Sequence, residues 1–200
     1  MTIHAALVDS ADLSTWLDGS INDLDMPAGI SERMAAGCFD QVHEHHKAIH
    51  LLLKNSLVGS AFSLVRPTLE TFVRGLWLLR CASEKEVESF TKDKIDKSFG
   101  DLIKEIEARD GYNVGVLSKV KKNYWGAMCS YAHGGYLQTV RRNTEAHITP
   151  NYSDDEKLEV VKFADTLALL AASEMFMMAN RDDMAAQVLE RMRAASVLLE

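Results

Sequence analysis

LVGSAFSLVRPTLETFVRGLWLL, residues 57–79, is the stretch of this chain that decides its fold. Its apolar residues recur at alternating spacings of four and three, which is the pattern of a helix packed into a core along one seam. The seam consists of Val58, Phe62, Val65, Leu69, Phe72, Leu76 and Leu79. Further leucines lie away from the seam, so most of the helix surface is apolar and a central position in the fold is predicted. The spacing continues through Pro67, which predicts one kinked helix rather than two helices.

Helix start signals elsewhere in the chain are typical of an all-α protein. Ser83–Glu86 and Ser153–Glu156 both match the capping box, in which a serine at the N-cap precedes a glutamate by three residues. Ser31 is predicted to cap a helix that runs to about Asn55. Alternating runs of β-branched residues are absent from the sequence, and Leu137–Val140 is the one short segment that could be extended.

The whole chain, residues 1–200, is predicted to be a single all-α domain. Two hundred residues suit one hydrophobic core, and the linkers between the predicted helices are short. Residues 1–30 are predicted to form an irregular N-terminal segment with one short helix near Leu13–Asp18. Residues 31–200 are predicted to form a helical bundle of five to six long helices.

The composition is that of a globular protein with an acidic net charge. The net charge of −7 argues against broad, non-specific attraction to nucleic acid or to anionic membranes. Cys38, Cys81 and Cys129 are isolated and form no C-x-x-C pair, which indicates reduced thiols and a cytoplasmic location. The N-terminus lacks the features of a secretory signal, and no run approaches the roughly 20 apolar residues of a membrane span. No membrane partner is therefore expected.

A charged stripe crosses the otherwise apolar helix at residues 57–79. Arg66, Glu70 and Arg74 follow one another at spacings of four, so their side chains line up on one helix face. The simplest interpretation is a solvated ladder of ion pairs, but because the rest of the helix is apolar, a buried structural network is placed first and anion binding second. The functional alternative is that Glu70 orients Arg66 to bind an anion such as phosphate.

The segment Gly111–Thr144 contains no acidic residue and five basic ones, so it carries +5 while the rest of the chain carries −12. This segregation of charge predicts a local anion-binding surface within an acidic protein. The basic residues of the segment are Lys119, Lys121, Lys122, Arg141 and Arg142. The candidates for binding an anion are Lys121, Lys122, Arg141 and Arg142, together with Arg74 of the charged stripe.

His133 lies between the two basic clusters of this segment, directly before Gly134 and Gly135. A histidine at the C-terminus of a helix interacts favourably with the helix dipole, so capping is the simpler interpretation. A histidine near neutral pH can also act as a general acid or base, which is the functional alternative. The candidate catalytic residues are therefore His133, Arg66 and Glu70.

Three histidines share one face of the helix predicted after Ser31. His43, His46 and His50 are spaced by three and four, and Asp40 precedes them by one turn. Imidazoles at such spacing can bind a metal ion, but bundle metal sites draw their ligands from at least two helices. No Glu-x-x-His motif occurs in the sequence, so the alternative is a polar helix face that meets the Arg66–Glu70 stripe. No phosphate-binding loop, dinucleotide motif or nucleophile elbow occurs either, and no cofactor is predicted.

Two motifs carry a resemblance to known proteins. Arg66-Pro67-x-x-Glu70, followed further on by Tyr131-Ala132-His133-Gly134, resembles a group of uncharacterised bacterial helical proteins over residues 44–140. More loosely, the architecture resembles HEPN-type bundles, which implies up-down helix packing. Many HEPN proteins are metal-independent ribonucleases in toxin–antitoxin and phage-defence systems, and they carry an Arg four to six residues before a His on one helix. In this chain the nearest basic residue before His133 is Lys122, so the HEPN arginine has no counterpart. The resemblance therefore assigns a role to His133 alone.

The resemblance implies a homodimeric protein that acts on or near RNA. His133 would then assist proton transfer at the 2′-hydroxyl, and Arg66, or Arg141 and Arg142, would stabilise the charge on phosphate. The missing Arg before His133 favours a different class, a non-catalytic module that binds a partner protein. A metal-dependent bundle enzyme that uses His43, His46 and His50 is the third hypothesis.

Overall fold

The computed structural model describes residues 1–27 and 29–194, and this part of the chain is all helical apart from its loops and one isolated β-bridge. The all-α class predicted from the sequence is confirmed. The described residues form nine helices, three of them of fewer than ten residues, and the predicted number of five to six long helices is not confirmed. Their bounds are α1 Ile3–Ile21, α2 Ile30–Lys54, α3 Val58–Arg80, α4 Glu84–Phe90, α5 Phe99–Glu107, α6 Val116–Ala132, α7 Tyr136–Val140, α8 Asp154–Met178 and α9 Asp182–Ala194.

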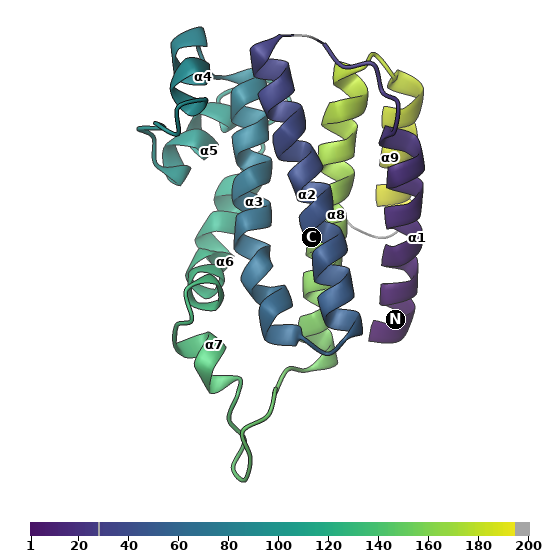
Figure 1. Ribbon diagram of the computed structural model, residues 1–200, viewed down its shortest axis with the longest axis vertical. Coiled ribbons are helices and arrows are strands. Elements are labelled where there is room, and N and C mark those ends of the chain that lie inside the picture. Colours follow the sequence, from purple (N-terminus) through teal and green to yellow (C-terminus); the bar gives the residue numbers. More distant parts are fainter. Residues whose placement is uncertain (28, 195–200) are drawn as a thin grey trace.

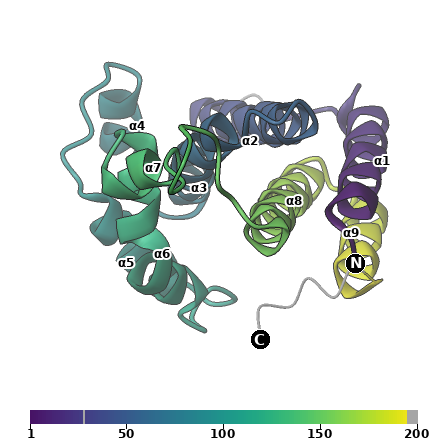
Figure 2. The ribbon, with the colours of Figure 1, turned by 90° about the horizontal axis from the view of Figure 1, so that it is seen from below.

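Helix α3 lies between two groups of helices (Figures 1 and 2). On one side it packs against α2 and α8, and α1 and α9 cover the far side of α8. On the other side α3 contacts α5 and α6, which stand apart from the long upright helices. The central position predicted for this helix is therefore correct, and α3 is the element that connects the main bundle to the α5–α6 side.

The apolar seam of α3 is buried along its length. Val58, Phe62, Val65, Leu69, Phe72 and Leu76 are all buried, and Leu79 is half-buried. The helix also continues through Pro67 without a break, as the spacing predicted. Burying such side chains stabilises a fold by roughly 1.5–3 kcal/mol each, which explains why the seam overrides the hydrogen bond that proline removes.

Helices α2 and α3 approach each other closely at Gly75. A Cβ atom at this position would lie 2.7 Å from the ring of Phe39 and 3.1 Å from the Cβ of Cys38. Phe39 also packs against Phe72, with ring centroids 6.1 Å apart. Gly75 is therefore required by the packing of these two helices and not by its own backbone angles.

Cys38 is predicted to be the least reactive of the three thiols. Burial raises its pKa to about 11, and the nearby Arg74 lowers it only in part. Because the thiolate is the nucleophile, native protein treated with iodoacetamide should be alkylated at the half-buried Cys81 and Cys129 well before Cys38. Mass spectrometry of timed samples measures the three rates, with urea-unfolded protein as the control. Equal rates in the native protein would contradict this packing.

Two sequence-based predictions on the N-terminal side are wrong. Residues 1–30 are not irregular with a short helix, because α1 spans 19 residues from its N-cap Thr2 onward. Its buried face holds a polar residue, Ser10, among Ala6, Leu13 and Leu17, and this polar residue interrupts the apolar pattern. Ser31 does not cap α2, because Gly29 occupies the N-cap and the Ser31 hydroxyl donates to the Leu78 carbonyl of α3.

The remaining local predictions have mixed outcomes. The capping box at Ser153–Glu156 is present, with the Ser153 N–H donating to the Glu156 carboxylate at 2.8 Å. The box at Ser83–Glu86 is present as well, and a third at Ser98–Asp101 begins α5. Leu137–Val140 is not extended but forms most of the short helix α7. Within residues 1–27 and 29–194, no helix is long and apolar enough to cross a membrane.

Candidate functional site

Arg66 is the centre of a polar cluster between α3 and α6. Its Nε and Nη2 atoms donate to Oε1 of Glu70 at 3.2 and 3.0 Å, and its Nη1 contacts Nε2 of His133. The guanidinium also lies over the ring of Trp125, 4.6 Å from its centroid. The side chains of Arg66 and Glu70 are 19% and 18% exposed, so this is neither a sealed core network nor a solvated ladder.

His133 is positioned by the way α6 ends. It is the C-cap residue of α6, and Gly134 follows with a φ of +64°, a conformation that favours glycine. The N–H of Gly135 then donates to the Ser130 carbonyl at 2.7 Å, which completes a Schellman motif. The predicted capping position is correct, but the imidazole of His133 contacts Arg66 of α3.

The contact with Arg66 fixes the tautomer of His133. A guanidinium has only hydrogen-bond donors, so Nε2 of His133 must be the acceptor. A neutral ring that accepts at Nε2 carries its proton on Nδ1. The side chain of His133 is exposed.

Trp125 connects this cluster to α5. Its ring stacks on Phe99, the first residue of α5, with centroids 4.4 Å apart and an interplanar angle of 12°. A cation over an aromatic face is worth about 0.5–2 kcal/mol, so Trp125 helps to hold Arg66. The sequence interpretation missed Trp125, although Trp125 and His133 lie two turns apart on one row of α6.

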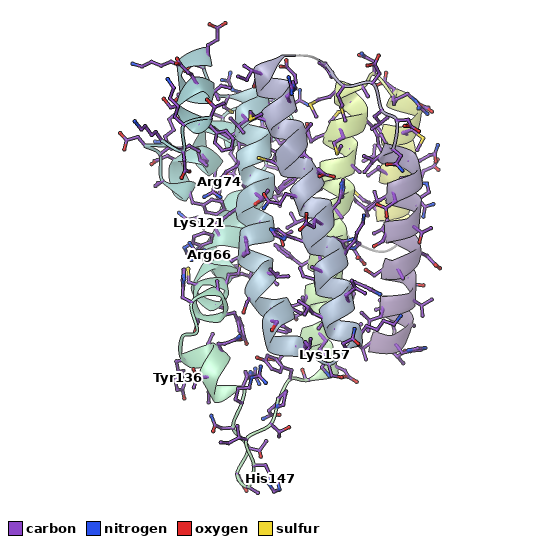
Figure 3. All side chains as sticks on the ribbon, viewed as in Figure 1. Arg66, Arg74, Lys121, Tyr136, His147 and Lys157 are labelled. Atoms are coloured by element: carbon purple, nitrogen blue, oxygen red, sulfur yellow. The ribbon has the colours of Figure 1, made fainter. Side chains whose placement is uncertain are left out.

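A hollow of about 500 Å³ lies beside Trp125, between α5 and α6. Residues that line it are Gly100, Ile103, Ser118, Lys121, Lys122, Trp125 and Gly126. Figure 3 shows Lys121 and Arg66 on the same side of the molecule, along α6 and α3. The structure thus places the predicted lysines next to the Arg66–His133 pair. Arg74 lies further along α3 on the same side.

Arg141 and Arg142 lie apart from this cluster. Arg141 pairs with Glu156 of α8 and lies over the Tyr152 ring, 6.0 Å from its centroid. Arg142 lies beside Gly59 in the first turn of α3. Since Gly59 and Arg66 are seven residues apart, Arg142 is about 10 Å from the site along the helix. The carbonyls of Arg141 and Arg142 accept backbone hydrogen bonds from Asn151 and Thr149 at the base of the hairpin in which Asn143 bridges to Ile148.

The histidine face of α2 is directed at α1 and α8, not at the Arg66–Glu70 stripe as the alternative interpretation expected. His46 contacts Asp165 Oδ1 through Nε2 at 2.6 Å, and Ser14 through Nδ1 at 3.3 Å. His43 contacts the Ala168 carbonyl through Nε2 at 2.9 Å. Within the described residues, no three His, Cys, Asp or Glu side chains are arranged to hold a metal ion. His50 is not part of either contact.

The buried His43 predicts that the protein loses stability in acid. Burial lowers the pKa of His43 to about 4, and the positive charge of nearby Lys47 acts in the same direction. The unfolded chain, with a pKa near 6.5, then binds more protons than the native one, so stability falls as pH drops from 6.5 towards 4. Urea unfolding at pH 7.5 and 5.0 should show a loss of about 2 kcal/mol from this group. His43→Gln should remove this loss of about 2 kcal/mol from the difference in stability between the two pH values. An unchanged pH dependence of stability in the variant would contradict the role given to His43.

The fold and the cluster define an all-helical protein with a basic, partly exposed Arg–His site. The chain belongs to DUF6988, a family of unknown function, whose model matches residues 39–197. The expectation of an uncharacterised family is thereby confirmed. The match begins within α2, so α1 lies outside it. Comparison with curated proteins and with solved structures gave no match.

Proposed function

We propose that this protein acts on RNA as a HEPN-like, metal-independent ribonuclease, in a phage-defence or toxin–antitoxin setting. The observation that carries the proposal is the contact between the Arg66 guanidinium and the His133 imidazole. HEPN-type proteins draw their Arg and His from one helix. In this chain Arg66 of α3 takes the place of the arginine that α6 lacks.

The geometry supports a division of roles between the two residues. Phosphate oxygens are strong acceptors for a guanidinium, so an RNA phosphate competes with His133 for the Nη1 donor of Arg66. Glu70 holds the other side of the guanidinium and keeps Arg66 in place. The release of Nε2 gives His133 a free lone pair next to the bound phosphate.

The reaction is a transfer within the RNA strand. The 2′-oxygen attacks the adjacent phosphorus, and its proton passes to Nε2 of His133. Arg66 stabilises the negative charge that develops on the phosphate oxygens. The bond from phosphorus to the 5′-oxygen breaks, and the leaving oxygen takes a proton from solvent. The products are a 2′,3′-cyclic phosphate and a 5′-hydroxyl.

A homodimer is part of the proposal. HEPN-type sites usually form across a dimer, and the exposed position of His133 leaves it accessible to a second copy of the chain. Light scattering of the purified protein tests this directly, and a monomer at assay concentrations would remove the dimer from the proposal.

The test of the proposed function is incubation of the purified protein with tRNA and with single-stranded RNA in the presence of EDTA. Fragments with 2′,3′-cyclic phosphate ends support the nuclease. Intact RNA after incubation with folded protein contradicts it. The second candidate, a non-catalytic interaction module, is favoured by the way Glu70, Trp125 and His133 together engage Arg66, as a structural network would.

A further inference from the structure

We infer that the hollow between α5 and α6 binds one unpaired nucleotide of an RNA strand, next to the Arg66–His133 pair. This inference rests on the proposed function, because it names the form of RNA that the same site would take. It concerns binding alone, however, so it can fail or succeed without the cleavage chemistry.

The first argument is position. Trp125 lines the hollow, and the Arg66 guanidinium lies over its ring, 4.6 Å from the ring centroid. A strand whose phosphate is bound by Arg66 therefore passes the hollow with a neighbouring nucleotide. The hollow is open to solvent, and its volume of about 500 Å³ is within the range of small-ligand sites.

The second argument is that the two lysines of the hollow form no ion pair with the residues that the structure describes. Within the described residues, neither Lys121 nor Lys122 takes part in an ion pair, whereas Lys97 is paired with both Glu86 and Glu105. Two acidic residues lie near the hollow. The Asp101 carboxylate accepts from the Ser98 hydroxyl at 2.6 Å, and the charge of Lys121 helps to lower its pKa. The Glu107 carboxylate accepts from the N–H of Ser118, which lines the hollow, at 2.9 Å. Neither lysine is held in an ion pair by a described residue, and a bound phosphate would compete with Asp101 for the charge of Lys121.

The third argument is the fit around Lys121. A Cβ atom at Gly100 would lie 2.6 Å from the Lys121 ammonium, so the glycine leaves room for that group against α5. Ile103 and Trp125 supply the apolar part of the hollow. Phe99 stacks on the Trp125 ring and the Arg66 guanidinium lies over it, so a base in the hollow contacts the edge of Trp125 while the lysines contact the phosphate. In a single strand the base is free to leave its stack. In a duplex the paired base cannot enter such a hollow.

The experiment is fluorescence anisotropy with a labelled 2′-O-methyl hexanucleotide, which cannot be cleaved through its 2′-oxygen. The double variant Lys121→Met/Lys122→Met is expected to weaken binding by at least about tenfold and to lower the log–log salt slope by about 0.7 for each lysine. Lys119→Met is the matched control, because Lys119 is an exposed lysine of the same helix that does not line the hollow. Its affinity should change by less than about twofold.

Gly100→Ala tests the geometry without a change of charge. The added methyl group displaces the flexible end of Lys121, so affinity should fall while thermal stability stays close to that of wild type. Gly37→Ala is the control, because a Cβ there meets no atom within 4 Å. The same sequence in a duplex should bind at least about tenfold more weakly than the single strand.

Three outcomes would overturn the inference. They are equal binding of duplex and single strand, an equal loss for Lys119→Met and the double variant, and full affinity of Gly100→Ala. Hollow-dependent binding by a protein that does not cleave RNA would retain the inference and remove the nuclease. RNA cleavage that is unaffected by replacement of the two lysines would retain the nuclease and remove the inference.

Discussion

Replacement of His133 by alanine is expected to slow RNA cleavage by about 100- to 10,000-fold, the usual contribution of a general acid or base. The side chain is exposed and its hydrogen-bond partner in this cluster is Arg66, so the fold should tolerate its loss. The cleavage rate constant at saturating RNA, measured in EDTA, gives the effect on the chemical step. Binding of the uncleavable hexanucleotide should change little, because Arg66 and the lysines remain.

His147→Ala is the matched control for this prediction. His147 is an exposed histidine in the hairpin that projects beyond α7, remote from Arg66 (Figure 3). Its loss should leave the rate unchanged. An equal decrease in both variants would indicate a contaminating nuclease, and a fully active His133→Ala protein would remove His133 from the mechanism.

Replacement of Trp77 by alanine is expected to lower the free energy of unfolding by about 3–5 kcal/mol, the usual cost of a large aromatic truncation in a core. Trp77 is 1% exposed, and its Nε1 donates to the Glu105 carboxylate of α5 at 2.7 Å. The Trp77 side chain therefore fills the core next to α3, and its hydrogen bond to Glu105 connects α3 to α5. Phe99, the first residue of α5, supports Trp125. Urea unfolding followed by circular dichroism measures the change.

Trp77→Phe separates the two contributions. Phenylalanine keeps most of the apolar contact but cannot donate to Glu105, which still accepts from Lys97 at 2.6 Å. Trp77→Phe should lower the free energy of unfolding by about 1–2 kcal/mol, mainly because the hydrogen bond to Glu105 is lost. A cost below about 1 kcal/mol for Trp77→Ala would show that α3 and α5 are not packed as described.

The parts of the fold that depend on one helix could be predicted from the sequence. The seam of α3 and the capping boxes are local patterns, because spacing along a helix determines which side chains share a face. The helix α1 was predicted too short, near Leu13–Asp18 only, because Ser10 interrupts its buried face. Ser10 is accommodated there by Asp165 of α8, to which its hydroxyl donates at 2.6 Å. That partner is 155 residues away in sequence, so no local pattern indicates it.

The candidate site divides in the same way. Arg66, Glu70 and His133 could be singled out by spacing and by their place at helix ends or on a stripe. That Arg66 and His133 touch is a property of how α3 packs against α6, and the sequence offered it as one of several options. Phe99 lies on a third helix, and the sequence contained no signal that it would support Trp125.

The histidine face of α2 shows how a local pattern can indicate the wrong neighbour. The spacing of His43 and His46 predicted one polar face, which is correct, but the partners of this face are α1 and α8. A helix presents several faces to the core, and which neighbour meets each face is decided by the packing of the whole bundle.

The most direct test of the Arg66–His133 unit is a double-mutant cycle on kcat/KM for cleavage of single-stranded RNA in EDTA. The four proteins are wild type, Arg66→Met, His133→Ala and the double variant. Residues that act as one unit are strongly non-additive, so the double variant should be about as slow as the slower single variant. A loss equal to the product of the two single losses, or RNA left intact by the wild type, would contradict the account.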